Sequence, residues 1–281
     1  MRRQGTIATV AGLGVSDHVC WSYDDESALR AAAVTFLREG AELGLRLAYV
    51  ADRPADALLA DLAPLPDRDV LVERGALLVL PLGDRYDVGR PIDAEEQASR
   101  YEDALHQAWA DGFAGLRIVA DGTALARDPA RRAALARWEQ LADERVAAGR
   151  PISALCAYDR RVLGDGAIDD VLCVHPLVHR DGEQPPFRLF ADGAGIALHG
   201  EVDVFAAAGL ERVLAASTVG GAALDVSRLR FIDHHGVIAL ARHAASVAEA
   251  RAALTIRGAS RALRHAWDVA LDGDAPPVRW A

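Results

Sequence analysis

The stretch HVCWSYDDESALRAAAVTFLREGAELGLRLAYVAD, residues 18–52, decides the fold class. HVCWSY is an apolar segment of strand length. The residues after it place apolar side chains at the i, i+3, i+4 spacing of a helix: Leu29, Ala32, Ala33, Phe36 and Leu37. LRLAYVAD is a second short apolar segment. A strand, a helix and a strand in this order predict a right-handed crossover between two parallel strands.

The same alternation continues to about residue 160. Apolar strand-like segments occur at 76–82, 115–121 and 152–158, and helical patterns cover 93–111 and 129–147. This rhythm predicts an α/β domain with a mainly parallel sheet and helices on both faces.

Ligands of such sheets bind beyond the carboxyl ends of the strands. Asp52, Asp121 and Tyr158 end or follow predicted strands, so we expect them to lie near any pocket.

A second α/β domain is predicted after a linker. RDGEQPP (180–186) is polar and rich in turn residues, which predicts a linker over 181–186, and FRLFADGAGIALHG (187–200) resembles two strands joined at Asp192-Gly193. Helical and strand patterns then alternate to the end. We therefore predict an N-terminal tail (1–16), a first domain (17–180) and a second domain (187–281).

Composition excludes several functions. The net charge is −10 and all 31 basic residues are arginine. A phosphate backbone needs a concentrated positive surface, so direct nucleic-acid binding is not expected. Without lysine there is neither Schiff-base chemistry nor a P-loop. Apolar runs are too short to span a membrane, no export signal is expected, and three scattered cysteines suit free thiols, so we expect a cytoplasmic protein.

DHHG, residues 233–236, stands where a strand pattern gives way to a helix. Asp233 is a suitable N-cap, and His234 and His235 then occupy the first helical turn. The helix dipole disfavours imidazolium there, so neutral histidines are expected. We do not expect a zinc site, because adjacent helical residues point about 100° apart.

GEVD (200–203) and LDVSRLRFIDHHG (224–236) resemble a STAS domain of the anti-sigma factor antagonist type. The resemblance implies a protein-interaction surface for an anti-sigma factor or a sensor histidine kinase-like protein. Its expected contact residues are Asp203, Asp233, His234, His235 and Gly236. The family phosphorylates the serine or threonine after the aspartate, where a phosphate adds about −2 charge. His234 stands there, so the ordinary switch cannot operate; phosphohistidine remains a chemical alternative.

The first domain resembles the MEDS sensory domain, named for methanogen and methylotroph regulators. The residues that carry the resemblance are His18, Cys20, Tyr23, Gly115, Arg117, Glu139, Cys156, Tyr158, Asp159, His175 and Pro176. It implies a RecA/KaiC-like fold without nucleotide chemistry. The first strand-to-helix loop, SYDDES, has three carboxylates and no glycine, so no ATP hydrolysis is expected. At Asp121 the family commonly has glutamate.

Several of these residues are candidates for a sensor pocket that takes a small-molecule effector: His18, Cys20, Tyr23, Asp121, Cys156, Tyr158 and His175. HVC and CVH each place a histidine and a cysteine two apart. If they converge, His18, Cys20, Cys156, Cys173 and His175 could hold zinc, iron or a haem. Alternatively, the cysteines are small buried hydrophobes and the histidines make structural hydrogen bonds.

These observations predict a signalling protein without enzymatic activity, with homodimerisation left open. Two alternatives remain. An enzyme would use His18, Cys20 and Asp121 and requires an exposed, low-pKa thiol. A scaffold would have an empty first domain and an apolar, closed strand-end region.

Overall fold

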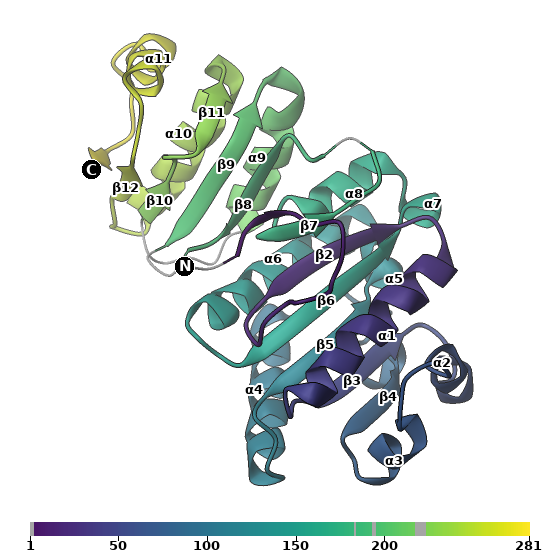
Figure 1. The fold of residues 1–281 in the computed structure, drawn as a ribbon. Coiled ribbons are helices and arrows are strands. Elements are labelled where there is room, and N and C mark those ends of the chain that lie inside the picture. The colour runs from purple at the N-terminus through teal and green to yellow at the C-terminus, as the bar shows by residue number, and fades with distance from the viewer. Residues whose placement is uncertain (1–2, 183, 193–194, 217–222) are drawn as a thin grey trace. The chain divides into compact units, whose positions relative to one another are not determined.

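The computed structural model describes residues 3–182, 184–192, 195–216 and 223–281 (Figure 1). The chain separates into two compact units, Met1–Glu183 and Gln184–Ala281. Each unit is an α/β structure, as the alternation of strand and helix patterns predicts.

The first unit is built on an all-parallel sheet of seven described strands in the order β1-β7-β2-β6-β5-β3-β4. The strands are β1 (Gly5–Thr6), β2 (His18–Tyr23), β3 (Arg46–Ala51), β4 (Leu77–Pro81), β5 (Leu116–Asp121), β6 (Ile152–Asp159) and β7 (Leu177–His179). The predicted parallel sheet is therefore confirmed. The central pair is β2 and β6, in which Cys20 is the register partner of Cys156.

Helices cover both faces of this sheet (Figure 1). They are α1 (Glu26–Glu42), α2 (Ala55–Asp61), α3 (Arg68–Glu73), α4 (Ala94–Ala110), α5 (Thr123–Ala126), α6 (Pro129–Ala147), α7 (Arg160–Leu163) and α8 (Asp165–Leu172), with a 3₁₀ turn η1 (Leu82–Asp84). Asp93 and Asp128 begin α4 and α6 by accepting hydrogen bonds from two backbone amides each. These N-caps fix both starts within a residue of the predicted ones.

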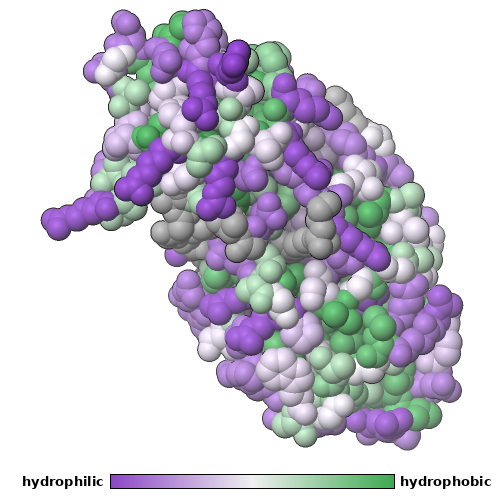
Figure 2. Space-filling view, turned by 60° about the vertical axis from the view of Figure 1, so that its left-hand side comes forward, coloured by the Kyte–Doolittle hydropathy of each residue, from purple (hydrophilic) through white to green (hydrophobic). Residues whose placement is uncertain are grey.

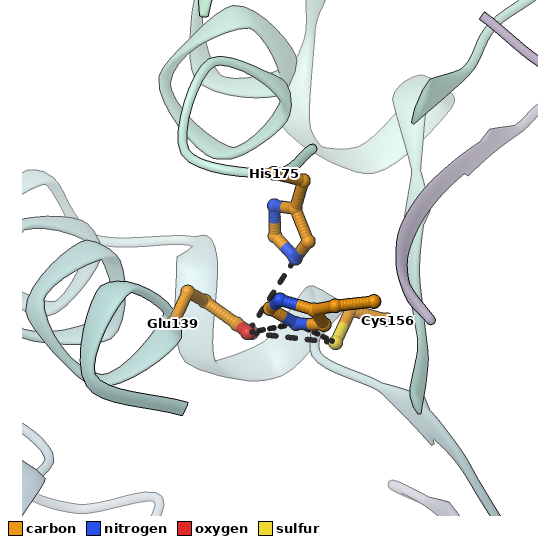
Figure 3. A group of neighbouring side chains, drawn as sticks. Glu139, Cys156 and His175 are labelled. Atoms are coloured by element: carbon orange, nitrogen blue, oxygen red, sulfur yellow. Dashed lines mark hydrogen bonds and ion pairs between the residues drawn. The ribbon is translucent and has the colours of Figure 1, made fainter. Parts of the chain in front are cut away.

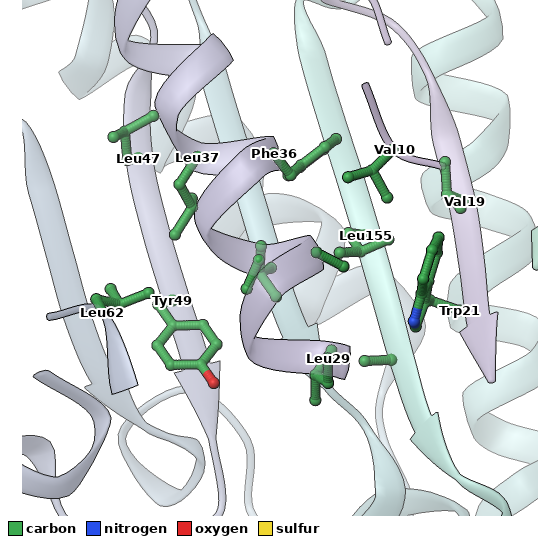
Figure 4. Close-up of a cluster of buried hydrophobic side chains, with 14 of the residues drawn as sticks. Val10, Val19, Trp21, Leu29, Phe36, Leu37, Leu47, Tyr49, Leu62 and Leu155 are labelled. Carbon is green, nitrogen blue, oxygen red and sulfur yellow. The ribbon is translucent and has the colours of Figure 1, made fainter. Parts of the chain in front are cut away.

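The alternation of side chains along β2 separates two different interiors. Val19 and Trp21 face α1 in an apolar core that also contains Phe36 and Leu155 (Figure 4). The intervening residues of β2 face the layer of α4, α6 and α8. Because successive strand residues point to opposite faces, His18 and Cys20 of β2 and Cys156 and Tyr158 of β6 lie on one side of the sheet, whereas Tyr23 lies on the other.

The second unit has a mixed sheet in the order β11-β9-β10-β12-β13, with β8 antiparallel to β9. Its elements are β8 (Phe187–Ala191), β9 (Ile196–Val202), α9 (Val204–Ala216), β10 (Ala223–Asp225), β11 (Leu229–Ile232), α10 (His234–Glu249), β12 (Leu254–Arg257), α11 (Arg261–Leu271) and β13 (Val278–Trp280). The predicted antiparallel pair is confirmed; Gly193 of its predicted turn lies outside the described residues.

On the face drawn in Figure 2, hydrophilic side chains alternate with smaller apolar patches. Among the helices of the described residues, none is long and apolar enough to cross a membrane.

Candidate functional site

Four buried side chains from separate segments meet on the α6 side of the first sheet. His18 begins β2, Cys156 lies within β6, Glu139 projects from α6, and His175 follows α8. Figure 3 shows Glu139, Cys156 and His175 pointing toward one another. We call these four residues the HECH cluster. Each is at least nine-tenths buried.

The polar atoms of the HECH cluster converge closely. Glu139 Oε2 lies 3.2 Å from His18 Nε2, 3.5 Å from Cys156 Sγ and 3.5 Å from His175 Nε2. Cys156 Sγ and His18 Nε2 are 3.5 Å apart. One ligand-type atom from each of the four residues lies within 4.8 Å of all the others. Such a group could hold a metal ion.

A second set of contacts orients these side chains. His18 Nδ1 lies 2.9 Å from Asp143 Oδ1, and His175 Nδ1 lies 2.8 Å from the Val171 carbonyl. Tyr158 donates to Glu139 Oε1 at 2.8 Å. Tyr158 reaches this position because Gly122 has no Cβ, which would lie 2.7 Å from the tyrosine ring.

The charges inside this region are strongly coupled. Burial lowers the pKa of His18, but hydrogen bonds with Asp143 and Glu139 and their negative charges raise it more, to about 9. Burial raises the pKa of Glu139, but contacts with His175 and His18 hold it well below its usual range. Burial and the Glu139 charge raise the pKa of the Cys156 thiol. Without a metal, the region therefore contains a carboxylate and an imidazolium.

A narrow cavity of about 60 Å³ ends at this cluster. It is lined mostly by apolar and aromatic side chains, among them Leu82, Tyr86, Tyr101, Ile118, Leu125, Leu135, Trp138 and Ala142, together with His18, Glu139 and Cys156. Pockets for drug-sized ligands have volumes of roughly 300–1,000 Å³. A haem, one of the expected cofactors, does not fit a space this small.

Two of the predicted metal candidates lie outside the HECH cluster. Cys20 is fully buried in the apolar core beside Cys156, and Cys173 directs its thiol to the Asp170 carbonyl at 3.3 Å. Neither belongs to the group whose ligand atoms converge. These two thiols follow the alternative expectation of small buried hydrophobes.

Tyr23 and Asp121 also lie apart from the cluster, because they belong to the opposite face of the sheet. Tyr23 donates to Asp121 Oδ2 at 2.8 Å. Burial raises the pKa of both groups. Together with Asp52 they line a pocket of about 210 Å³ at the carboxyl ends of the strands. Tyr158 does not line this pocket; it lines the cavity beside the HECH cluster, to which Asp121 also contributes, so all three residues predicted at strand ends lie at a pocket.

Two carboxylates of this region were not among the predicted site residues: Glu139 carried only the family resemblance, and Asp143 was missed. Both carboxylates lie on the buried side of α6, among Leu135, Trp138 and Val146. Two acidic residues spaced i, i+4 on the apolar face of a predicted helix are a signal for paired buried charges, since unpaired ones are costly.

The second histidine pair lies at the start of α10. Asp233 caps this helix by accepting from the Gly236 amide at 3.0 Å, as predicted. The expectation that His234 and His235 diverge is wrong: their ring centroids are 3.8 Å apart, and one ligand-type atom of each lies within 4.8 Å of an Asp233 oxygen. This group is largely exposed, and the Asp233 carboxylate already serves as the cap.

A parallel α/β sheet with a cavity and convergent polar groups on one face is an arrangement typical of ligand-binding domains. The family model of MEDS, the MEthanogen/methylotroph, DcmR Sensory domain, matches residues 17–176. This match spans more than half of the chain, and the chain belongs to the MEDS family. All four residues of the HECH cluster lie inside the matched range. The search of curated proteins found no match.

Proposed function

We propose that this protein is a cytoplasmic signal-transduction protein. Its MEDS unit senses a small effector and thereby changes how a STAS-like second unit engages a partner protein. Membership of a sensory-domain family supports the input role. The sequence motifs around Asp203 and Asp233 support the output role.

The cavity that ends at the HECH cluster carries the sensing proposal. Its volume of about 60 Å³ suits a molecule of only a few non-hydrogen atoms, since a water molecule occupies roughly 30 Å³ in the liquid. Its walls are mainly apolar, and His18, Glu139 and Cys156 offer polar groups at one end. A small, weakly polar organic molecule is the effector that this lining favours.

The test is a panel of one- to three-carbon alcohols and halocarbons, with binding measured by NMR chemical-shift changes on the full chain. Ala142 lines the cavity, and Ala142→Met fills it, so the variant is expected to lose the response. Ala147→Met is the matched control, because Ala147 lies on the same helix and is similarly half-buried but does not line the cavity. No response in the wild type, or equal loss in both variants, would contradict the proposal.

The second unit offers a surface suited to a partner. Asp203 caps α9 and Asp233 caps α10, and the Asp233 amide donates to the Val202 carbonyl, so the two helix starts lie side by side. Phe205, next to this junction, is 89% exposed. An exposed aromatic side chain beside two helix N-termini is typical of a binding surface rather than of a core.

The proposed partner is an anti-sigma factor or a sensor histidine kinase-like protein. We expect the wild type to bind such a kinase without being phosphorylated on a hydroxyl, because His234 occupies the acceptor position. His234→Ser is expected to restore phosphoserine, detected by mass spectrometry after incubation with the kinase and ATP. Phe205→Ser is expected to weaken binding. Unchanged binding in Phe205→Ser and no phosphate in His234→Ser would contradict the STAS assignment.

The proposal assigns no chemical reaction to the protein. The enzyme alternative needs an exposed thiol with a lowered pKa. Burial instead raises the pKa of Cys20, which is fully buried. Asp121, the third residue of that alternative, directs its carboxylate to Tyr23 and the Thr123 amide.

A further inference from the structure

We propose that the HECH cluster is a tetrahedral site for one divalent transition-metal ion, with zinc as the best-suited ion. The ligand atoms are His18 Nε2, Glu139 Oε2, Cys156 Sγ and His175 Nε2. This proposal does not rest on the effector, because it concerns only the four side chains and their immediate neighbours.

The spacing of the ligand atoms matches tetrahedral coordination. Zinc bonds of about 2.0–2.1 Å to nitrogen or oxygen and 2.3 Å to sulfur place N and O ligands about 3.3 Å apart, and S about 3.5 Å from either. Glu139 Oε2 lies 3.2 Å from His18 Nε2 and 3.5 Å from His175 Nε2. Cys156 Sγ lies 3.5 Å from both His18 Nε2 and Glu139 Oε2. The four side chains can therefore surround an ion without large movement.

The neighbouring groups prepare the ligands for a metal. Histidine ligands usually donate their other ring N–H to a carboxylate or a backbone carbonyl. His18 Nδ1 meets Asp143 at 2.9 Å, and His175 Nδ1 meets the Val171 carbonyl at 2.8 Å. Both contacts place a proton on Nδ1, which leaves Nε2 of each ring as the nitrogen available to a metal ion. The Tyr158 hydroxyl holds the other oxygen of Glu139.

Without a metal ion, the hydrogen bonds within the cluster are incomplete. His175 Nε2 is buried and makes no hydrogen bond to any described residue. Its distance of 3.5 Å from Glu139 Oε2 is longer than an N–H···O hydrogen bond of about 2.7–3.2 Å. A metal ion between the two atoms would give His175 Nε2 a partner.

Charge and ligand type select the ion. A thiolate and a carboxylate neutralise a divalent cation, which suits a site closed to water. Magnesium and calcium prefer oxygen ligands alone, whereas mixed thiolate and imidazole ligands suit zinc. His18, Glu139 and Cys156 belong to the cluster and also line the cavity, so they would contact both the ion and any bound effector.

The test is loading of the full chain, after removal of metal with a chelator, with Co²⁺ as a spectroscopic substitute for Zn²⁺. We expect one ion per chain, a visible band of tetrahedral cobalt, and an ultraviolet thiolate-to-cobalt band that Zn²⁺ abolishes. Cys156→Ser should lose the thiolate band, and His175→Gln should weaken binding at least about tenfold. Cys20→Ser is the matched control, because Cys20 is the equally buried register partner of Cys156.

Two results would overturn the site: no thiolate band in the wild type, or its equal loss in Cys20→Ser and Cys156→Ser. If Cys156→Ser does not fold, native mass spectrometry of the wild type decides the case. One ion per chain at micromolar metal supports the proposal and none refutes it. Metal binding without a response to the small-molecule panel would refute the sensing proposal alone.

Discussion

The chain contains two pairs of histidines that share one chemistry and differ in every structural respect. His18 and His175 are more than 150 residues apart in sequence, yet their ring centroids lie 4.4 Å apart in the interior. His234 and His235 are adjacent and lie at the surface of a helix start. The adjacent pair is more conspicuous in the sequence, but the distant pair has more charged and hydrogen-bonding neighbours.

The difference lies in what surrounds the imidazoles. The buried pair is held by two carboxylates of α6 and a backbone carbonyl of α8. Beside the exposed pair lies Asp233, 3.4 Å from His235 Nδ1. A functional cluster is therefore recognised by convergence and burial, because these determine how strongly each group depends on its partners.

Removing the carboxylate beside each histidine pair should give the largest difference in stability between the two regions. Glu139→Ala leaves Tyr158 without its buried partner and His18 with Asp143 alone, and is expected to lower the free energy of unfolding by about 3–5 kcal/mol. Asp233→Ala removes an N-cap and should cost about 0.5–2 kcal/mol. Urea unfolding of both variants measures the difference. Equal losses would show that the buried charges are not coupled as described.

Zinc should stabilise the protein through the buried pair alone. An ion at 100 times its Kd that binds only the folded state adds about 2.7 kcal/mol to the free energy of unfolding. The double variant His234→Ala/His235→Ala should keep this gain, and His175→Gln should lose most of it. Thermal unfolding with and without Zn²⁺ provides the measurement. If the stabilisation by Zn²⁺ disappears in His234→Ala/His235→Ala, the ion binds at the exposed pair instead of the buried one.

The packing that holds Glu139 in place can be tested without changing a polar group. In Gly122→Ala the new methyl meets the Tyr158 ring, so we expect a loss of about 1–3 kcal/mol and weaker metal binding. Gly166→Ala is the control: it faces open space on α8 and should be neutral or slightly stabilising. Urea unfolding and cobalt titration of both variants distinguish them. If Gly122→Ala changes neither stability nor metal binding, Tyr158 does not hold Glu139 in place.

His199, a buried histidine of β9, should make stability depend on pH. Burial, Arg188 and Arg228 lower the pKa of His199 from 6.5 to about 4. The unfolded chain therefore binds the additional proton between these values, and stability falls as the pH drops from about 6.5 to about 4. His199→Gln should show a weaker fall than the wild type in unfolding midpoints measured across this range. Identical curves would contradict the assigned pKa shift.

The smallest effect is expected at the surface. His235 is 44% exposed in its side chain, and its contact with Asp233 is long. Exposed pairs of this kind contribute about 0–1 kcal/mol, so His235→Ala should change stability by less than about 0.5 kcal/mol. The same urea assay measures it, and a loss above 1 kcal/mol would mean that the exposed pair is structural.

Much of the fold could be predicted from sequence, because strand and helix periods differ and the helix caps are local. The 129–147 helix and the Asp233 cap depend on residues close together in the chain, and both were correctly predicted. Strands β1 and β13 are only two and three residues long and carry too little pattern to be recognised. Pairing of such short strands depends on distant neighbours.

The candidate site was only partly predictable for the same reason. His18, Cys156 and His175 stood among the candidates, but which cysteine joined the histidines depended on sheet register and on where α8 ends. Cys20 and Cys156 are register partners, yet only Cys156 reaches the cluster. Glu139 and Asp143 lie within a helix that carries many other charged residues, so neither stood out. The spacing of those two carboxylates was the signal available.

X-ray absorption at the zinc edge of the loaded wild-type protein tests the central claim most directly, because it counts the atoms around the ion. If zinc binds at the HECH cluster, the spectrum should show one sulfur at about 2.3 Å and three nitrogen or oxygen atoms at about 2.0–2.1 Å, with imidazole scattering beyond them. A shell without sulfur would place the ion elsewhere, for example at His234 and His235, and would contradict the assignment of the HECH cluster as the metal centre.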